Sequence, residues 1–135
     1  MKHEHVAGLV RHRIEQAQQA LEDARFLFEG NRTTQSVINR LYYAMFYAVL
    51  ALLQTVGKSP SKHRGVMSFC DTEFVMKDIF PKSMSKNLHD AFDLRQTSDY
   101  DPIESVPREV ANEMVKKAEV FVKTIQDYLR RKAYF

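Results

Sequence analysis

Residues 41–53 of this chain, Leu-Tyr-Tyr-Ala-Met-Phe-Tyr-Ala-Val-Leu-Ala-Leu-Leu, form its most apolar stretch. In and around it, apolar side chains recur every three or four residues, as in an α-helix, at Val37, Leu41, Met45, Ala48, Leu52 and Val56. The tyrosines and phenylalanine between them make the segment apolar nearly all round, and such a helix is normally buried. We therefore expect a helix from near Thr33–Thr34 to Gly57, placed at the centre of the fold or at a subunit interface.

The same period predicts one helix before this segment and three after it. The earlier helix should end at Gly30–Asn31, which tolerate the left-handed conformation of a helix stop. The later helices are expected to begin at an N-cap on Ser61, to span 82–97 and to span 107–131. Residues 98–102 have the composition of a turn, and the residue before a proline avoids the helical region. No segment alternates as a strand would, so the predicted class is all-α, a bundle of four to five helices.

Length and composition indicate one globular domain. The 135 residues, 44% hydrophobic and 27% charged, suffice for a single domain over 1–135 with a core over about 7–131. A lone cysteine, Cys70, excludes a disulfide framework and a Cys-based zinc site. The apolar run at 41–53 is shorter than the roughly 20 residues of a membrane helix, and the N-terminus lacks the apolar region of a secretory signal. We expect a soluble, cytoplasmic protein with no membrane partner.

Charge is unevenly distributed along the chain. Residues 30–70 contain five basic residues and no Asp or Glu, whereas residues 71–105 contain eight acidic and four basic residues. A stretch without carboxylates can form a positive surface suited to phosphate. The alternative is that solvated helix ends happen to carry the lysines and arginines.

Residues 61–66, Ser-Lys-His-Arg-Gly-Val, are the first candidate site. Lys62, His63 and Arg64 would lie at a helix N-terminus, where free backbone N–H groups favour an anion. Alternatively, His63 caps or packs locally. The familiar catalytic and metal-binding motifs are absent from the sequence, so neither a metal nor a cofactor is expected.

Arg95 is the second candidate. It lies near the apolar face of its helix and needs a partner, which Asp99 at i+4 can supply. In one interpretation the ion pair only stabilises the end of the helix, and Tyr100 packs over it. In the other, Arg95 is directed into a groove, where it binds phosphate.

Four segments, in this order, resemble the HEPN domain family. They are 20–24 (Ala-Leu-Glu-Asp-Ala), 41–48 (Leu-Tyr-Tyr-Ala-Met-Phe-Tyr-Ala), 61–66 (Ser-Lys-His-Arg-Gly-Val) and 91–100 (Ala-Phe-Asp-Leu-Arg-Gln-Thr-Ser-Asp-Tyr). The chain is most similar to stand-alone bacterial and archaeal HEPN proteins of the uncharacterised conserved type. The resemblance implies an up-and-down bundle, like the substrate-binding subunit of nucleotidyltransferases. It also implies a homodimer whose intersubunit groove is lined by the second helix and the region around Arg95.

Many HEPN proteins are metal-independent ribonucleases. Their signature is an arginine followed, after four to six intervening residues, by a histidine. The resemblance places Arg95 at the arginine, but Tyr100 stands where the histidine is expected, and no histidine follows His89. Tyrosine, with a pKa near 10, is a poor general base at neutral pH, which argues against the usual route. His63 is a histidine that could face the same groove.

Three functions are therefore considered. The first is a partner protein that binds nucleotide or RNA phosphate and works with a separately encoded minimal nucleotidyltransferase, in a toxin–antitoxin pair or a bipartite transferase. In it, phosphate would be bound by Arg95, His63, Lys62 and Arg64. The second is a ribonuclease toxin with a rearranged catalytic site of Arg95, Asp99, Tyr100 and His63. The third is a purely structural, dimeric interaction module.

Overall fold

The computed structural model describes residues 2–100 and 106–135, which form five α-helices and one π-helical turn. Their bounds are α1 Lys2–Glu29, α2 Thr34–Thr55, α3 His63–Cys70, η1 Asp71–Val75, α4 Lys82–Tyr100 and α5 Arg108–Arg131. No strand occurs within these two ranges. The predicted all-α class is confirmed.

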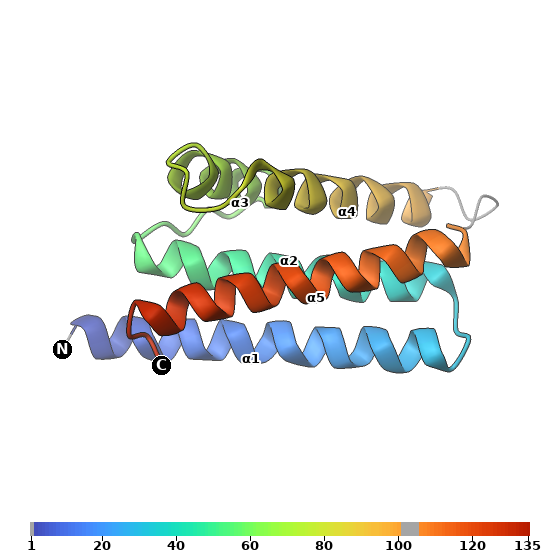
Figure 1. Ribbon diagram of the computed structural model, residues 1–135, viewed down its shortest axis with the longest axis horizontal. Helices are drawn as coiled ribbons and strands as arrows, with labels where there is room; N and C mark the ends of the chain where they lie inside the picture. Colours follow the sequence, from blue (N-terminus) through green and yellow to red (C-terminus); the bar gives the residue numbers. More distant parts are fainter. Residues whose placement is uncertain (1, 101–105) are drawn as a thin grey trace.

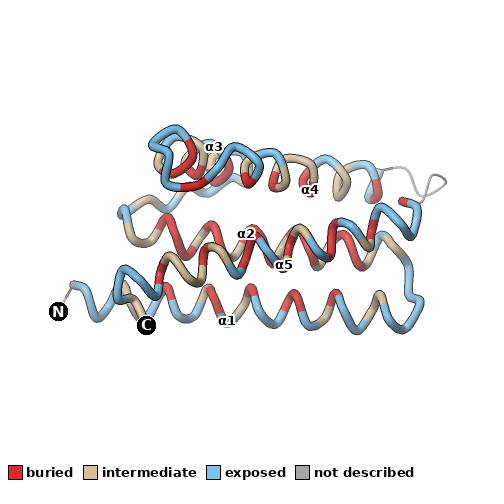
Figure 2. Tube along the Cα trace, viewed as in Figure 1, coloured by how far each residue is buried: buried red, intermediate tan, exposed pale blue. Residues whose placement is uncertain are grey.

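α2 is the central helix of the bundle. Figure 1 shows α1 on one side, α3 and α4 on the other, and α2 and α5 between them. α2 contacts each of the other four α-helices, and its contact with α1 is the most extensive in the bundle. Buried positions follow nearly the whole of α2, whereas on α1 they keep to one face (Figure 2). The segment around 41–53 is therefore the core helix that its composition predicts.

By length and composition α2 is able to cross a membrane, which corrects the expectation drawn from residues 41–53 alone. The helix is longer than that run, because Val37 and Ile38 extend its apolar character toward the N-terminus. However, 67% of its most apolar window is buried inside the bundle. This burial is what the core helix of a soluble protein shows.

The helix ends follow local capping chemistry only in part. Thr33 caps α2, since its Oγ1 accepts a hydrogen bond from the Ser36 backbone N–H at 3.3 Å. α1 stops where Asn31 adopts a left-handed φ of 55°. The predicted N-cap on Ser61 is wrong, because α3 begins one residue later, after Lys62, with no side-chain cap. There Pro60 packs so closely on Gly65 that a Cβ on the glycine would lie 3.1 Å from the proline Cβ.

α4 is longer than predicted. It continues to Tyr100, so the turn expected over 98–102 is wrong for residues 98–100. Arg95 and Asp99 form an ion pair across this last turn, which favours its helical form. Residues 101–102 lie outside the described residues.

Candidate functional site

Arg95 lies on the side of α4 that faces α2, over two tyrosine rings. Its guanidinium carbon is 5.1 Å from the centroid of the Tyr42 ring and 5.4 Å from that of Tyr43. The Arg95 side chain is 23% exposed, and its Nε is buried with no hydrogen-bond partner among the described residues. Cation–π contacts with two rings hold the guanidinium in place.

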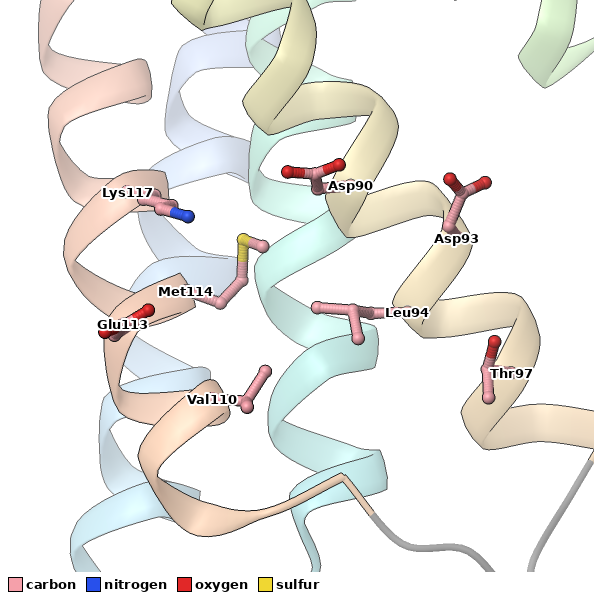
Figure 3. A pocket seen from close by; sticks show the side chains of 8 residues that line it. All are labelled: Asp90, Asp93, Leu94, Thr97, Val110, Glu113, Met114 and Lys117. Atoms are coloured by element: carbon pink, nitrogen blue, oxygen red, sulfur yellow. The ribbon is translucent and has the colours of Figure 1, made fainter.

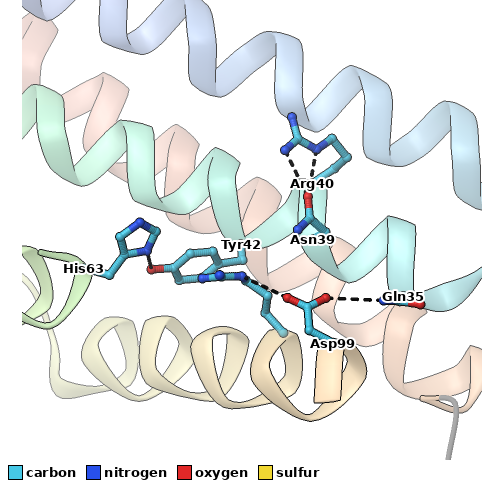
Figure 4. Close-up of polar contacts among 7 residues, drawn as sticks. Gln35, Asn39, Arg40, Tyr42, His63 and Asp99 are labelled. Carbon is cyan, nitrogen blue, oxygen red and sulfur yellow. Dashed lines mark hydrogen bonds and ion pairs between the residues drawn. The ribbon is translucent and has the colours of Figure 1, made fainter. Parts of the chain in front are cut away.

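Asp99 is the acidic neighbour of Arg95, one helical turn further along α4. Its Oδ2 is 3.6 Å from the Arg95 Nε, which is an ion pair but beyond hydrogen-bond distance. Its Oδ1 accepts a long hydrogen bond of 3.4 Å from Gln35 Nε2 on α2, as Figure 4 shows. Asp99 therefore connects the end of α4 to the start of α2 and neutralises Arg95 only partly.

His63, the first residue of α3, contacts the same tyrosine. The Tyr42 hydroxyl and His63 Nδ1 are 2.8 Å apart (Figure 4). The imidazole stacks on Phe46 with 4.2 Å between ring centroids and meets Tyr43 edge-on. Tyr42 thus connects three helices, and we call the group of Tyr42, Tyr43, His63, Arg95 and Asp99 the Arg95 site.

Burial favours the uncharged forms of two rings of this site, Tyr42 and His63. Burial raises the pKa of the Tyr42 hydroxyl well above its ordinary value, although the positive charge of Arg95 acts in the opposite direction. Burial lowers the pKa of His63, and Arg95 lowers it further. Arg95 therefore supplies the positive charge of the site, in partly buried surroundings where its attraction for an anion is stronger than in bulk water.

A second arginine, Arg40, flanks Tyr43 on α2. Its guanidinium carbon is 5.2 Å from the Tyr43 ring centroid, and its Nε and Nη2 donate hydrogen bonds of 3.2 and 3.0 Å to Asn39 Oδ1 (Figure 4). Arg40 and Asp99 both line a cavity of about 450 Å³, together with Leu27, Gln35, Ser36 and Asn39. Through Asp99, this polar cavity adjoins the Arg95 site.

The structure brings together three of the residues singled out in the sequence, Arg95, Asp99 and His63, and separates two others from them. Lys62 is exposed just before α3, and Arg64 lines a different cavity, between α3 and α4. The separation follows from helix geometry, because consecutive residues point about 100° apart around the axis.

Tyr100 is the last residue of α4, and its side chain lies outside the described residues. Its role in the site stays a prediction. Among the residues that are described, no three His, Cys, Asp or Glu side chains gather as they would around a metal ion.

Sequence reasoning missed two contacts. One is the hydrogen bond of Tyr42 to His63. Three tyrosines on an apolar helix indicate that a hydroxyl needs a polar partner, but nothing local identifies a partner 21 residues away. The other is between His89 and Asp71, whose Nε2 and Oδ2 are 3.0 Å apart. His89 and Arg95 contact different neighbours, as a separation of six residues on one helix predicts.

A cavity of about 320 Å³ lies between α4 and α5 (Figure 3). Three of its lining residues are apolar and four are charged: Leu94, Val110 and Met114, with Asp90, Asp93, Glu113 and Lys117. Three carboxylates against one lysine repel a phosphate. This cavity is therefore a poorer anion site than the Arg95 site.

Comparisons with known proteins agree with this architecture. The model of the HEPN domain family matches residues 10–128. A "UPF0332 protein" of Thermotoga maritima is 37% identical over 82% of this chain and 83% of its own length. Two proteins of Methanocaldococcus jannaschii, named provisionally as toxins, are each 32% identical, one over 86% of this chain and 78% of its own length and the other over 87% and 86%. Since the family match covers nearly the whole bundle, the chain belongs to the HEPN domain family.

Proposed function

We propose that this HEPN-domain protein binds the phosphate of a nucleotide or of RNA at the Arg95 site, as one component of a two-gene system. The observation that carries the proposal is the position of Arg95, whose guanidinium lies over Tyr42 and Tyr43 while 23% of the side chain stays exposed. Arginine binds phosphate oxygens through paired, charge-assisted hydrogen bonds. An arginine already held in place loses less conformational freedom on binding.

The surroundings of Arg95 also favour an anion. Residues 30–70, which include α2 and α3, contain no carboxylate. Asp99 lies 3.6 Å from Arg95 and is also held by Gln35. A phosphate oxygen therefore does not have to displace a close, bidentate ion pair before it binds the guanidinium.

The proposed partners are a second copy of this chain and a separately encoded minimal nucleotidyltransferase. A second copy is supported by a half-buried stripe on α2, formed by Tyr43, Tyr47 and Leu50, which continues from the Arg95 site. The transferase partner follows from family membership, because HEPN proteins are often encoded beside such enzymes. The provisional toxin names of two relatives support a toxin–antitoxin pair. A bipartite transferase, in which this chain supplies substrate-binding helices, is the other form of the proposal.

Fluorescence anisotropy with a labelled single-stranded RNA, and with a labelled ATP, tests this function. Arg95→Ala is expected to weaken binding by about tenfold or more, since it removes a charge-assisted contact. Arg11→Ala is the matched control, because Arg11 is an exposed arginine on α1, on the opposite side of the bundle. If Arg95→Ala lowers only the melting temperature, and binding equals that of wild type or is absent from both, the proposal fails and a structural interaction module is the better description.

A metal-independent ribonuclease is the second candidate, favoured by the position of His63 beside Arg95. In RNA cleavage of this kind a base removes the proton of a ribose 2′-hydroxyl, whose oxygen then attacks the adjacent phosphorus. The bond from phosphorus to the 5′-oxygen breaks, and that oxygen takes a proton from water. A neutral His63 that donates Nδ1–H to Tyr42 has its Nε2 free to accept the first proton, while Arg95 stabilises the charge on the phosphate oxygens.

The ribonuclease candidate is tested by incubating the protein with bulk RNA in EDTA, beside Arg95→Ala and His63→Ala variants shown to be folded. Cleavage by wild type that disappears in both variants would establish a site built on these two residues. Cleavage that survives in His63→Ala would exclude this histidine as the base. Intact RNA with every protein would leave phosphate binding as the function of the site.

A further inference from the structure

The cavity between α4 and α5, which we call the acidic cavity, has an apolar floor. The floor is formed by Leu94 of α4 with Val110 and Met114 of α5, whose side chains point toward one another (Figure 3). Met114 is 3% exposed and Val110 is 37% exposed, so the floor runs from the molecular surface into the core. The volume of about 320 Å³ is near the lower limit of small-molecule sites.

Carboxylates outnumber basic groups around the acidic cavity. Its charged lining residues are Asp90, Asp93, Glu113 and Lys117. Asp90 is already paired with Lys86, with 2.6 Å between Oδ2 and Nζ. No ion pair joins Asp93, Glu113 or Lys117 to another of the described side chains. Two carboxylates therefore remain against one lysine, and the cavity attracts a cation.

Asp93 also lines a neighbouring cavity of about 500 Å³ between α3 and α4. This second cavity has an apolar floor too, formed by Met67 and Phe92, which are 4% and 8% exposed. The titratable residues that line it besides Asp93 are Arg64, Asp71 and His89. Asp93 is exposed, so the two cavities adjoin on the outer side of α4, with apolar contact area on both sides of one carboxylate.

The chemistry of this surface fits a protein better than a small amine. Asp93 and Glu113 are exposed, and exposed carboxylates hold a lone small cation only weakly. A protein segment can cover both cavities and add apolar burial to the charge attraction. An arginine side chain combines an aliphatic stem with a cationic head, and arginines that fill pockets are common among the residues that dominate interface energetics.

We propose that the acidic cavity binds an arginine side chain of a partner protein. The aliphatic stem packs on Leu94 and Met114, and the guanidinium pairs with Asp93 and Glu113. The segment that carries this arginine crosses the outer side of α4 toward the cavity beside α3. The proposal does not depend on the function of the Arg95 site, because Arg95 lies on the side of α4 that faces α2.

The test uses a fluorescein-labelled peptide of alternating alanine and arginine, with fluorescence anisotropy as the readout. The full-length protein is expected to bind this peptide, less tightly as salt is added, and to bind a matched alanine–glutamine peptide much more weakly. The NMR signals of the Leu94 methyl groups should shift on binding. An unmoved Leu94 signal, or equal binding of the two peptides, would overturn the inference.

Two variants with matched controls locate the site. Removing both charges in Asp93→Asn/Glu113→Gln should weaken binding of the arginine peptide by about tenfold. Glu4→Gln/Glu15→Gln is the control, because it removes two exposed carboxylates from α1, on the opposite side of the bundle (Figure 1). Equal weakening by both double variants would mean that only net charge matters, and would overturn the proposal.

Val110→Lys adds a positive charge at the rim of the acidic cavity and should also weaken binding. Val120→Lys adds the same charge on α5 at a position that is 65% exposed and outside the cavity lining, so it should bind nearly as wild type does. Equal binding by Val110→Lys and wild type would contradict the proposed contact.

Two further measurements distinguish the other possible occupants. Agmatine, a small cation with the same guanidinium and a similar stem, should bind at least about tenfold more weakly than the peptide. Agmatine that binds as tightly would make a small amine the occupant. Light scattering should give Val110→Lys the same mass as wild type. A lower mass would make a second copy of the chain the occupant, and either result would overturn the proposal.

Discussion

Tyr42 has no exposed surface, and its hydroxyl is hydrogen-bonded to His63 at 2.8 Å. Tyr42→Phe keeps the shape of the ring but leaves the His63 Nδ1 beside an apolar edge. We expect the variant to be less stable by about 1 kcal/mol in urea unfolding. Tyr47→Phe, on the half-buried stripe of the same helix, is the control and should unfold as wild type does. A Tyr42→Phe protein as stable as wild type would show that this hydrogen bond adds nothing to the fold.

His63 gives the protein a pH-dependent stability with a defined sign. The unfolded chain protonates this histidine near pH 6.5, whereas burial and Arg95 lower its pKa in the folded state. Between the two pKa values the unfolded state holds more protons, so the contribution to stability is complete above pH 6.5 and declines as the pH falls below it.

NMR titration of the His63 ring measures this shift directly. Its pKa in wild type should lie below 6.5, and Arg95→Gln should raise it by removing the nearby positive charge. Arg11→Gln, which removes a remote charge, should leave it unchanged. A wild-type pKa of His63 above 6.5 would contradict the arrangement described for the Arg95 site.

At the scale of the helix, α1 and α2 form the most extensive contact in the bundle, and both carry buried small side chains. Ala17, Ala20 and Ala24 on α1 and Ala44 and Ala48 on α2 are at most 2% exposed. Since Ala48 has no exposed surface, Ala48→Leu should overpack the core and destabilise the protein by about 1–3 kcal/mol in urea unfolding. Gln19→Leu adds a similar side chain at an exposed position of α1 and should change stability by less than about 0.5 kcal/mol. An Ala48→Leu protein as stable as wild type would mean that α2 can shift to accommodate the larger side chain.

The helices could be predicted from the sequence because apolar spacing is a local property of the chain. Two helix ends could not, since the packing of Pro60 on Gly65 and the ion pair of Arg95 with Asp99 override local cap and turn preferences. The contacts of the Arg95 site could not be predicted from neighbouring residues in the sequence either. They join residues 21 positions apart for Tyr42 and His63, and 64 apart for Gln35 and Asp99, so they depend on how the helices cross.

At the scale of the whole molecule, different positions around α4 contact three different regions of the bundle. Arg95 faces the tyrosines of α2, His89 pairs with Asp71 beside α3, and Leu94 lines the acidic cavity against α5 (Figure 3). A substitution on α4 therefore affects one of these regions according to its position around the helix.

The half-buried α2 stripe of Tyr43, Tyr47 and Leu50 leads to a prediction about assembly. Aromatic side chains of this kind are enriched at interfaces, and a second copy would bury them. Light scattering coupled to gel filtration should give twice the chain mass of 15.8 kDa. Tyr47→Glu would place an unpaired charge in that interface and should yield a folded monomer, while Gln19→Glu on exposed α1 should remain dimeric.

A wild-type protein that is monomeric at every concentration tested would refute the homodimer. If the dimer forms through α2, the Arg95 site lies at its edge, because Tyr43 belongs to both. Binding of RNA should then weaken in Tyr47→Glu even though Arg95 is untouched. Full binding by a monomeric Tyr47→Glu protein would instead show that one chain carries the complete phosphate site, and dimerisation would have to serve another purpose.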